Sequence, residues 1–154
     1  MDTLCFMNII AYALLISCFK ASMAVSSIGQ SQILSDASRT TLTSKGGNFD
    51  LGFFTPGNSN KRYLGISYKK IPKIVVWVAN SVNPTNDSTG VVTVNASSNL
   101  VLTQNNTVVW HMDLTRQAQN LVSELLDSGN FVVRDVNEAN PKALRMVCFG
   151  ALRK

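Results

Sequence analysis

Short apolar runs separated by turn-forming residues follow one another from residue 41 to residue 135. The runs are rich in Val, Ile, Leu, Phe, Tyr and Trp, while Gly, Pro, Asn, Asp and Ser occupy the gaps. No stretch of useful length there places apolar residues at helical spacing, so the pattern predicts an all-β fold. The predicted strands span residues 41–43, 49–54, 63–68, 74–80, 91–95, 100–103, 107–111, 121–127 and 131–135.

Three of the predicted turns share one composition, which indicates an internal repeat. Each places two small residues and an Asn before an apolar run: Gly46-Gly47-Asn48, Ser97-Ser98-Asn99 and Ser128-Gly129-Asn130. A Val-Val-Trp segment follows the first two turns, and Trp77 and Trp110 are predicted to pack at the centre of the core. A unit of two or three short strands cannot bury its own apolar face, so the units are expected to close around one core. No Trp follows the third turn, which predicts an incomplete third wall.

The start of the chain has the shape of a secretory signal peptide. An apolar run extends from Leu4 to Phe19, which is shorter than the roughly twenty residues that span a bilayer. Ser22 and Ala24 supply the small residues expected before a cleavage site. The segment before the run carries an acidic residue and no Lys or Arg, which leaves an uncleaved anchor as the alternative. We expect residues 1–24 to be removed, leaving a secreted or cell-surface protein with no membrane span.

In a secreted protein, Asn-x-Ser/Thr tripeptides can be glycosylated and cysteines can form disulfides. Three such tripeptides predict N-glycosylation at Asn86, Asn95 and Asn105. Cleavage would remove two of the three cysteines and leave Cys148, so no intrachain disulfide is expected.

Composition narrows the functional classes. The chain has 154 residues, of which 45% are hydrophobic and 15% charged, enough for one domain. Its net charge of +5 is dispersed along the sequence, whereas nucleic-acid binders gather their positive charge on one face, so no nucleic-acid partner is expected. The single His, His111, has no nucleophile elbow and no second His near it, so the sequence predicts no enzyme, no metal site and no cofactor.

The repeat resembles the bulb-type, mannose-specific lectin domain at the N-terminus of plant S-locus glycoproteins and S-domain (G-type lectin) receptor-like kinases. The segments that carry the resemblance are residues 44–57, 62–66, 75–80 and 125–130. It implies a bulb-lectin β-prism of three antiparallel four-stranded sheets with pseudo-threefold symmetry, the third sheet being incomplete. With the predicted signal peptide at 1–24, the resemblance gives a lectin domain at 25–141, and the C-terminal tail at 142–154 departs from the family's expected continuation.

The family's sugar site is a strand motif, Gln-x-Asp-x-Asn-x-Val-x-Tyr, that occurs once per repeat. Laid on this sequence, the motif keeps its Asn in all three repeats, and the candidate sugar-binding residues are Asn48, Asn95, Asn99, Val101 and Asn130. Most other polar partners of the motif are missing, and each lost hydrogen-bonding group weakens the recognition of sugar hydroxyls. Weak binding at the second repeat is the best remaining case, although the repeated Asn also suits a turn in the left-handed backbone region.

By this resemblance the chain is a non-enzymatic carbohydrate-recognition module for mannose-type glycans or glycoproteins, with a role in cell recognition such as pollen recognition. The receptors' kinase domain does not fit in this length. Two alternatives stay open. One is a protein-interaction module or decoy that pairs with a receptor-kinase ectodomain or with itself, and the other is a truncated product without a stable fold.

Overall fold

The computed structural model describes residues 24–25, 27–114, 119–137 and 143–147, and all of them lie in strands, turns or loops. The segment predicted to be a signal peptide lies outside this part of the chain except for Ala24, and Cys5, Cys18 and Cys148 lie outside it as well. Within it, no helix is long and apolar enough to cross a membrane.

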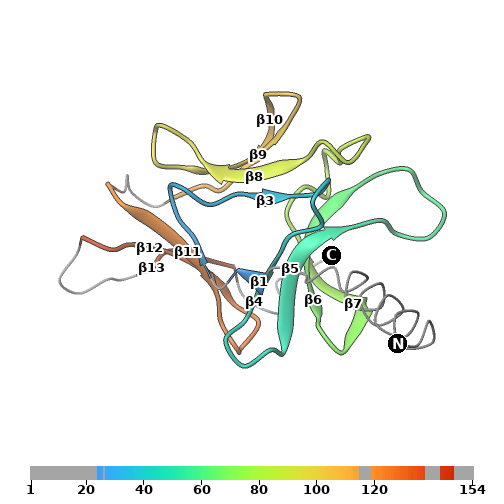
Figure 1. Cartoon of the computed structure of the whole chain (residues 1–154), viewed down its shortest axis with the longest axis horizontal. Helices are drawn as coiled ribbons and strands as arrows, with labels where there is room; N and C mark the ends of the chain where they lie inside the picture. Colours follow the sequence, from blue (N-terminus) through green and yellow to red (C-terminus); the bar gives the residue numbers. More distant parts are fainter. Residues whose placement is uncertain (1–23, 26, 115–118, 138–142, 148–154) are drawn as a thin grey trace, which may run out of the picture.

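Three β-sheets form the walls of a three-sided prism (Figure 1). The first sheet has the order β1 (Ala24–Val25), β4 (Thr41–Thr43), β5 (Phe49–Phe54), β6 (Tyr63–Tyr68) and β7 (Ile71–Val78). The second has the order β10 (Thr107–His111), β9 (Leu100–Gln104), β8 (Val91–Val94) and β3 (Leu34–Ser35). The third has the order β13 (Ala143–Val147), β12 (Phe131–Asp135), β11 (Leu121–Leu125) and β2 (Ser27–Ile28). The predicted all-β prism is confirmed, except that the first sheet has five strands instead of four because β1 pairs parallel to β4; every other pair is antiparallel.

The third sheet is complete, and the prediction of an incomplete third wall is wrong. Its fourth strand, β13, lies in the segment interpreted as a divergent tail and pairs antiparallel with β12. A strand joins a sheet through backbone N–H and C=O groups, so this position can be filled without the Trp that the repeat led us to expect.

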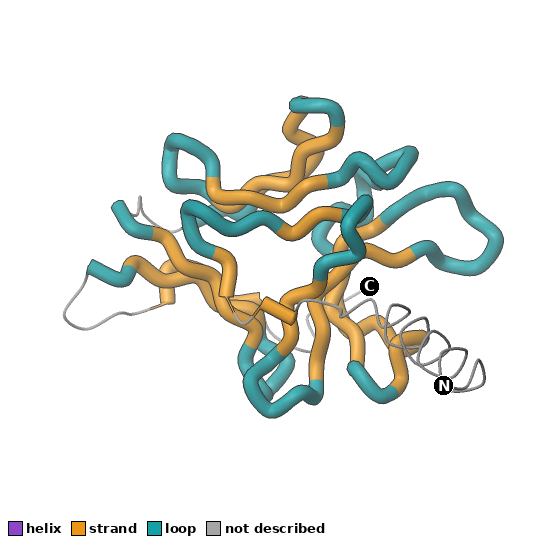
Figure 2. The backbone as a smooth tube through the Cα atoms, in the orientation of Figure 1, coloured by secondary structure: helices purple, strands orange, loops and turns teal. Residues whose placement is uncertain are grey.

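The N-terminal segment gives one short strand to each wall. β1 joins the first sheet, β2 the third and β3 the second, and the tube in Figure 2 shows this segment passing from wall to wall. Each of these strands has only two residues, too few for an alternating pattern to be read from the sequence. The segment therefore links all three sheets through backbone hydrogen bonds.

One apolar core fills the space between the walls. Every sheet contributes fully buried side chains, including Leu51 from the first, Leu102 from the second and Phe131 from the third. Trp77 and Trp110 are half-buried and pack against this cluster, with ring centroids 6.1 Å apart in an edge-to-face arrangement. The prediction that both lie at the centre is thus corrected: they join β7 to β10 at the border of the core.

Polar contacts tie distant loops together. The carboxylate of Asp36, whose side chain is 1% exposed, accepts two hydrogen bonds from the guanidinium of Arg62. This hydrogen bonding is the main reason why the pKa of Arg62 is raised above its ordinary value. A third guanidinium nitrogen donates to Thr55 Oγ1 at 2.6 Å. At the other end of strands β5 and β6, the Asp127 carboxylate accepts a hydrogen bond of 2.6 Å from the backbone N–H of Gly46. This bond joins the first and third repeat turns.

Candidate functional site

The three repeat turns adopt the same backbone geometry. In each, an N–H donates to the carbonyl three residues earlier: Gly47 to Ser44 at 2.8 Å, Ser98 to Asn95 at 2.9 Å, and Gly129 to Leu126 at 2.9 Å. These three donors also have positive φ angles of 73°, 53° and 79°. The residue in the left-handed region is therefore the one before each Asn, and the interpretation of the Asn as the left-handed residue is wrong. The internal repeat itself is confirmed at the backbone level.

Each repeated Asn stands directly before a strand, namely β5, β9 or β12. The residue after it faces the core, so the motif places two and four residues after the Asn lie on the outer face of the sheet. The outer faces of the three sheets are thus the three candidate sugar sites, and their side chains differ.

Charged and polar groups occupy the outer face of the first sheet. Asp50 stands where the lectin motif has Val, and its Oδ1 accepts a hydrogen bond of 2.6 Å from the Thr43 hydroxyl. The ammonium of Lys69 lies 3.5 Å from the same oxygen. Gly52 stands where the motif has Tyr, and a Cβ there would lie 2.9 Å from Thr41 Cγ2. This face lacks both the apolar floor and the aromatic edge of the motif.

An ion pair occupies the outer face of the third sheet. Arg134, at the Tyr place of the motif, directs Nη1 to within 3.3 Å of Glu124 Oε2 on β11. Val132 keeps the apolar place of the motif and is fully buried. Leu126 and Ser128 stand where the motif has Gln and Asp, so two of its carboxyl and amide groups are absent.

The outer face of the second sheet carries no charge at the motif places. Asn95 Oδ1 accepts hydrogen bonds from the N–H groups of Ser97 at 3.0 Å and Asn99 at 2.9 Å. Asn99 Oδ1 is buried, and no residue in the described part of the chain donates a hydrogen bond to it. Val101 is 3% exposed and lies between Thr93 on β8 and His111 on β10. This face combines uncharged polar groups with a small apolar residue, and the described residues supply no donor to the Asn99 carbonyl oxygen.

The glycosylation candidates differ in their accessibility. Asn86 and Asn105 are exposed, and Asn105 lies with Asn106 in the two-residue turn between β9 and β10, where both have positive φ. Asn95 is half-buried, and its carbonyl oxygen is engaged by the repeat turn. A glycan on Asn95 would stand on the outer face of the second sheet.

A His–Asp contact lies at the end of β10. His111 Nδ1 lies 3.3 Å from Asp113 Oδ1, and both side chains are mostly exposed. No group of three His, Cys, Asp or Glu side chains that could hold a metal ion occurs among the described residues.

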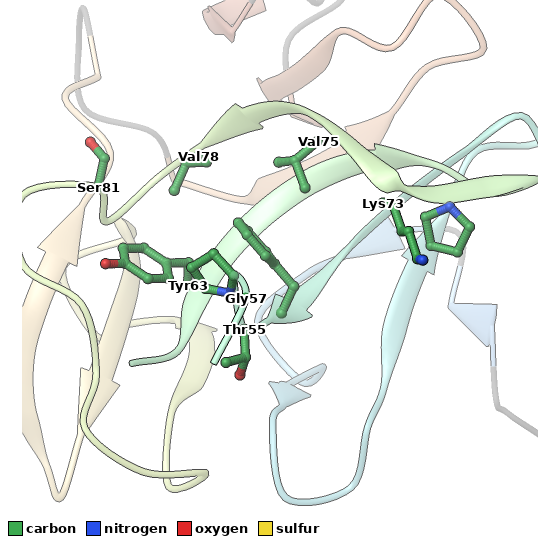
Figure 3. Close-up of a pocket in the computed structure, with 10 residues that line it drawn as sticks. Thr55, Gly57, Tyr63, Lys73, Val75, Val78 and Ser81 are labelled. Atoms are coloured by element: carbon green, nitrogen blue, oxygen red, sulfur yellow. The ribbon is translucent and has the colours of Figure 1, made fainter. Parts of the chain in front are cut away.

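The sequence analysis missed a groove on the outer face of the first sheet (Figure 3). It has a volume of about 880 Å³ and lies away from the three repeat turns. Its lining residues are Phe54, Thr55, Pro56, Gly57, Tyr63, Pro72, Lys73, Val75, Val78 and Ser81. The dense run of aromatic residues and Pro in β5 and the following loop is the only sequence signal that pointed there.

Comparison with known proteins relates this geometry to lectins. Residues 74–145 match the family model described as D-mannose binding lectin. The chain is 42% identical over 123 residues to receptor-like serine/threonine-protein kinase SD1-8 of Arabidopsis thaliana. It is 39% identical over 120 residues to S-locus-specific glycoprotein S6 of Brassica oleracea. These alignments cover 78% and 76% of this chain but only 14% and 28% of the two relatives.

Solved structures of lectins have the same fold. The Japanese Marasmius oreades lectin superposes with a TM-score of 0.61 at 16% identity, over 85% of this chain and 97% of that lectin. A monomeric monocot mannose-binding lectin from Gastrodia elata superposes with a TM-score of 0.59 at 16% identity, over 82% and 98% of the two chains.

Proposed function

The chain belongs to the bulb-type, D-mannose binding lectin family of S-locus glycoproteins and G-type lectin receptor-like kinases, and on this premise we propose that it is a carbohydrate-recognition module outside the cell. The matching segment is a lectin domain and not a kinase domain. The proposed module therefore binds a ligand and performs no chemistry on it.

The second repeat is the sugar site of this proposal. The observation that carries it is Asn99 Oδ1, a buried acceptor to which none of residues 24–25, 27–114, 119–137 and 143–147 donates. Leaving such a group unpaired costs about 1–3 kcal/mol. Because Asn99 as a residue is only half-buried, a rotation of its side chain that exposes the oxygen would let a sugar hydroxyl donate to it and recover part of that cost. The outer faces of the first and third sheets place charged groups, around Asp50 and Arg134, where the motif has uncharged ones. We therefore expect weak binding of a mannose-type glycan at one site, with Asn95 and Val101 beside Asn99.

The proposal extends to the cellular setting. Residues 1–24 act as a cleaved signal peptide, so cleavage removes Ala24 from β1 and leaves Val25 beside Leu42 on β4. The lectin domain begins at residue 25 and includes β13. The mature protein is secreted to the apoplast or held at the cell surface. Similarity to an S-locus-specific glycoprotein supports a role in cell recognition, pollen recognition included.

The test is binding of the full chain, expressed through a plant secretory pathway, to immobilised mannose-type glycans. Asn99→Ala should abolish the binding, while the matched change Asn48→Ala, at the equivalent exposed position of the first repeat, should leave it unchanged. Equal loss in both variants, or no binding by the unchanged chain, would contradict a site at the second repeat.

A second candidate function is a protein-interaction module. β7 is an edge strand of the first sheet, and Ile71 and Ile74 on it are 54% and 47% exposed. Exposed apolar residues on an unpaired edge favour contact with another chain. Co-precipitation with a receptor-kinase ectodomain, or self-association, that persists in excess mannose would favour this function over glycan binding.

A further inference from the structure

Two aromatic rings form the floor of the groove on the first sheet. Phe54 on β5 and Tyr63 on β6 are cross-strand partners with ring centroids 5.8 Å apart and planes tilted by 32°. Gly65 makes this arrangement possible, because a Cβ at that position would lie 2.7 Å from Phe54 Cε1. The result is an apolar platform that is open to solvent. The C–H face of a pyranose ring is complementary to such a surface, since its weakly positive hydrogens meet the negative face of an aromatic ring.

Polar groups stand at both ends of this platform. Figure 3 shows Lys73 at one end and Ser81 beyond Tyr63 at the other, with Val75 and Val78 along one side. An open groove with polar groups at its two ends suits a segment of an oligosaccharide better than a purely apolar molecule, which would be buried on all sides.

The charge of the groove favours an anion. No Asp or Glu is among its lining residues, and Lys73 makes no ion pair among the described residues. The chain as a whole carries a net charge of +5. An unpaired ammonium beside an apolar platform is complementary to a carboxylate carried on a ring.

We propose that the groove is a second carbohydrate subsite, and that it takes an acidic oligosaccharide of the uronate class. One sugar ring stacks on Phe54 and Tyr63, and the carboxylate of that ring or of its neighbour pairs with Lys73. The subsite deepens the proposed lectin function and rests on it. It uses none of the repeat-motif residues, so a substitution in one site should leave ligand binding at the other site unchanged.

The test measures binding of α-1,4-linked trigalacturonate to the full chain by titration calorimetry. Its methyl ester is the matched ligand, because it keeps the rings and removes the negative charge. We expect the ester to bind about tenfold or more weakly, and Lys73→Met to weaken trigalacturonate binding by a similar factor. Raising the salt concentration should also weaken binding, since the ammonium is exposed to solvent.

Lys70→Met is the matched control, because Lys70 is an exposed lysine near Lys73 that does not line the groove. It should change the affinity less than twofold. Tyr63→Ala should weaken the binding of trigalacturonate and of its methyl ester by the same factor, because it removes part of the aromatic platform and leaves the Lys73 ammonium in place. Equal losses in Lys70→Met and Lys73→Met would mean nonspecific charge attraction and would overturn the subsite. Equal affinity for acid and ester, or no binding of either, would overturn it as well.

Measuring mannose-type binding in the same variants distinguishes the uronate subsite from the sugar site at the second repeat. Asn99→Ala should leave trigalacturonate binding intact, and Lys73→Met should leave mannose-type binding intact. Loss of uronate binding in Asn99→Ala would overturn a separate subsite. Binding of an acidic peptide that trigalacturonate does not displace would assign the groove to a protein partner instead.

Discussion

Replacing Arg62 by Met should destabilise the prism strongly. The change leaves the Asp36 carboxylate, with a 1% exposed side chain, without the guanidinium that now donates two hydrogen bonds to it. Breaking a buried pair from one side costs about 3–5 kcal/mol. Because the Arg62 side chain is itself 26% exposed, water can reach part of the site, and we expect the lower end, about 3 kcal/mol. In a domain of this size that corresponds to a fall in Tm of roughly 10 °C.

Urea denaturation and thermal melting of the full chain check this value. Arg39→Met is the control, because Arg39 is exposed on the loop between β3 and β4 and makes no ion pair among the described residues. It should shift the free energy of unfolding by less than about 0.5 kcal/mol. The double change Asp36→Leu with Arg62→Met should recover much of the loss, since it removes the stranded charge.

The stabilisation that the Asp36–Arg62 pair provides should depend on pH in one direction only. The pair raises the pKa of Arg62, so its stabilisation is fully present below the ordinary arginine pKa and is lost only above it. The stability lost in Arg62→Met through this group should therefore be constant between about pH 6 and pH 9. A loss below 1 kcal/mol in Arg62→Met, or a double variant less stable than the single one, would refute the reasoning.

The remaining predictions concern backbone positions and glycans. Gly65→Ala should lower the free energy of unfolding by about 1–3 kcal/mol in urea titrations, because its Cβ would meet the ring of Phe54; an unchanged midpoint would contradict the close packing. Ser98→Gly should raise the melting temperature slightly, since φ at Ser98 is 53° and glycine adopts this region without strain, whereas a lower melting temperature would speak against that geometry. Mass spectrometry before and after enzymatic deglycosylation should find a glycan on Asn105, and an unmodified Asn95 would agree with its half-buried position in the repeat turn.

The strands with regular alternation could be predicted with their bounds. Residues 49–54 and 63–68 form β5 and β6 as expected, because several apolar residues lie between clear turn signals. The two-residue strands β1, β2 and β3 carry no such pattern and depend on pairing with strands far away in the sequence. β13 was missed for a related reason: the expectation rested on a missing Trp, whereas the strand is held by its backbone pairing with β12.

The candidate sites were less predictable because they depend on side chains that meet across strands. The repeat turns predicted the positions of the lectin motif, and sugar binding at those positions stays a prediction. The pairing of Asp50 with Lys69 and of Glu124 with Arg134 could not be read from the motif, since Lys69 lies in the turn after β6 and Glu124 lies on β11, both outside the strands that carry the motif. The groove beside Lys73 was missed for the same reason.

Inward and outward side chains of the prism are constrained to different degrees. An inward side chain contacts residues from more than one sheet, so its volume and polarity are constrained by the shared core. An exposed outward side chain contacts mainly its cross-strand neighbours, and a change there costs little as long as those neighbours accommodate it. The outer faces of the three sheets can therefore differ while the fold stays the same. Two of them carry ion pairs, and the second keeps Asn99 with an unpaired acceptor. For this reason the repeat predicts the fold, whereas the ligand must be argued from each face in turn.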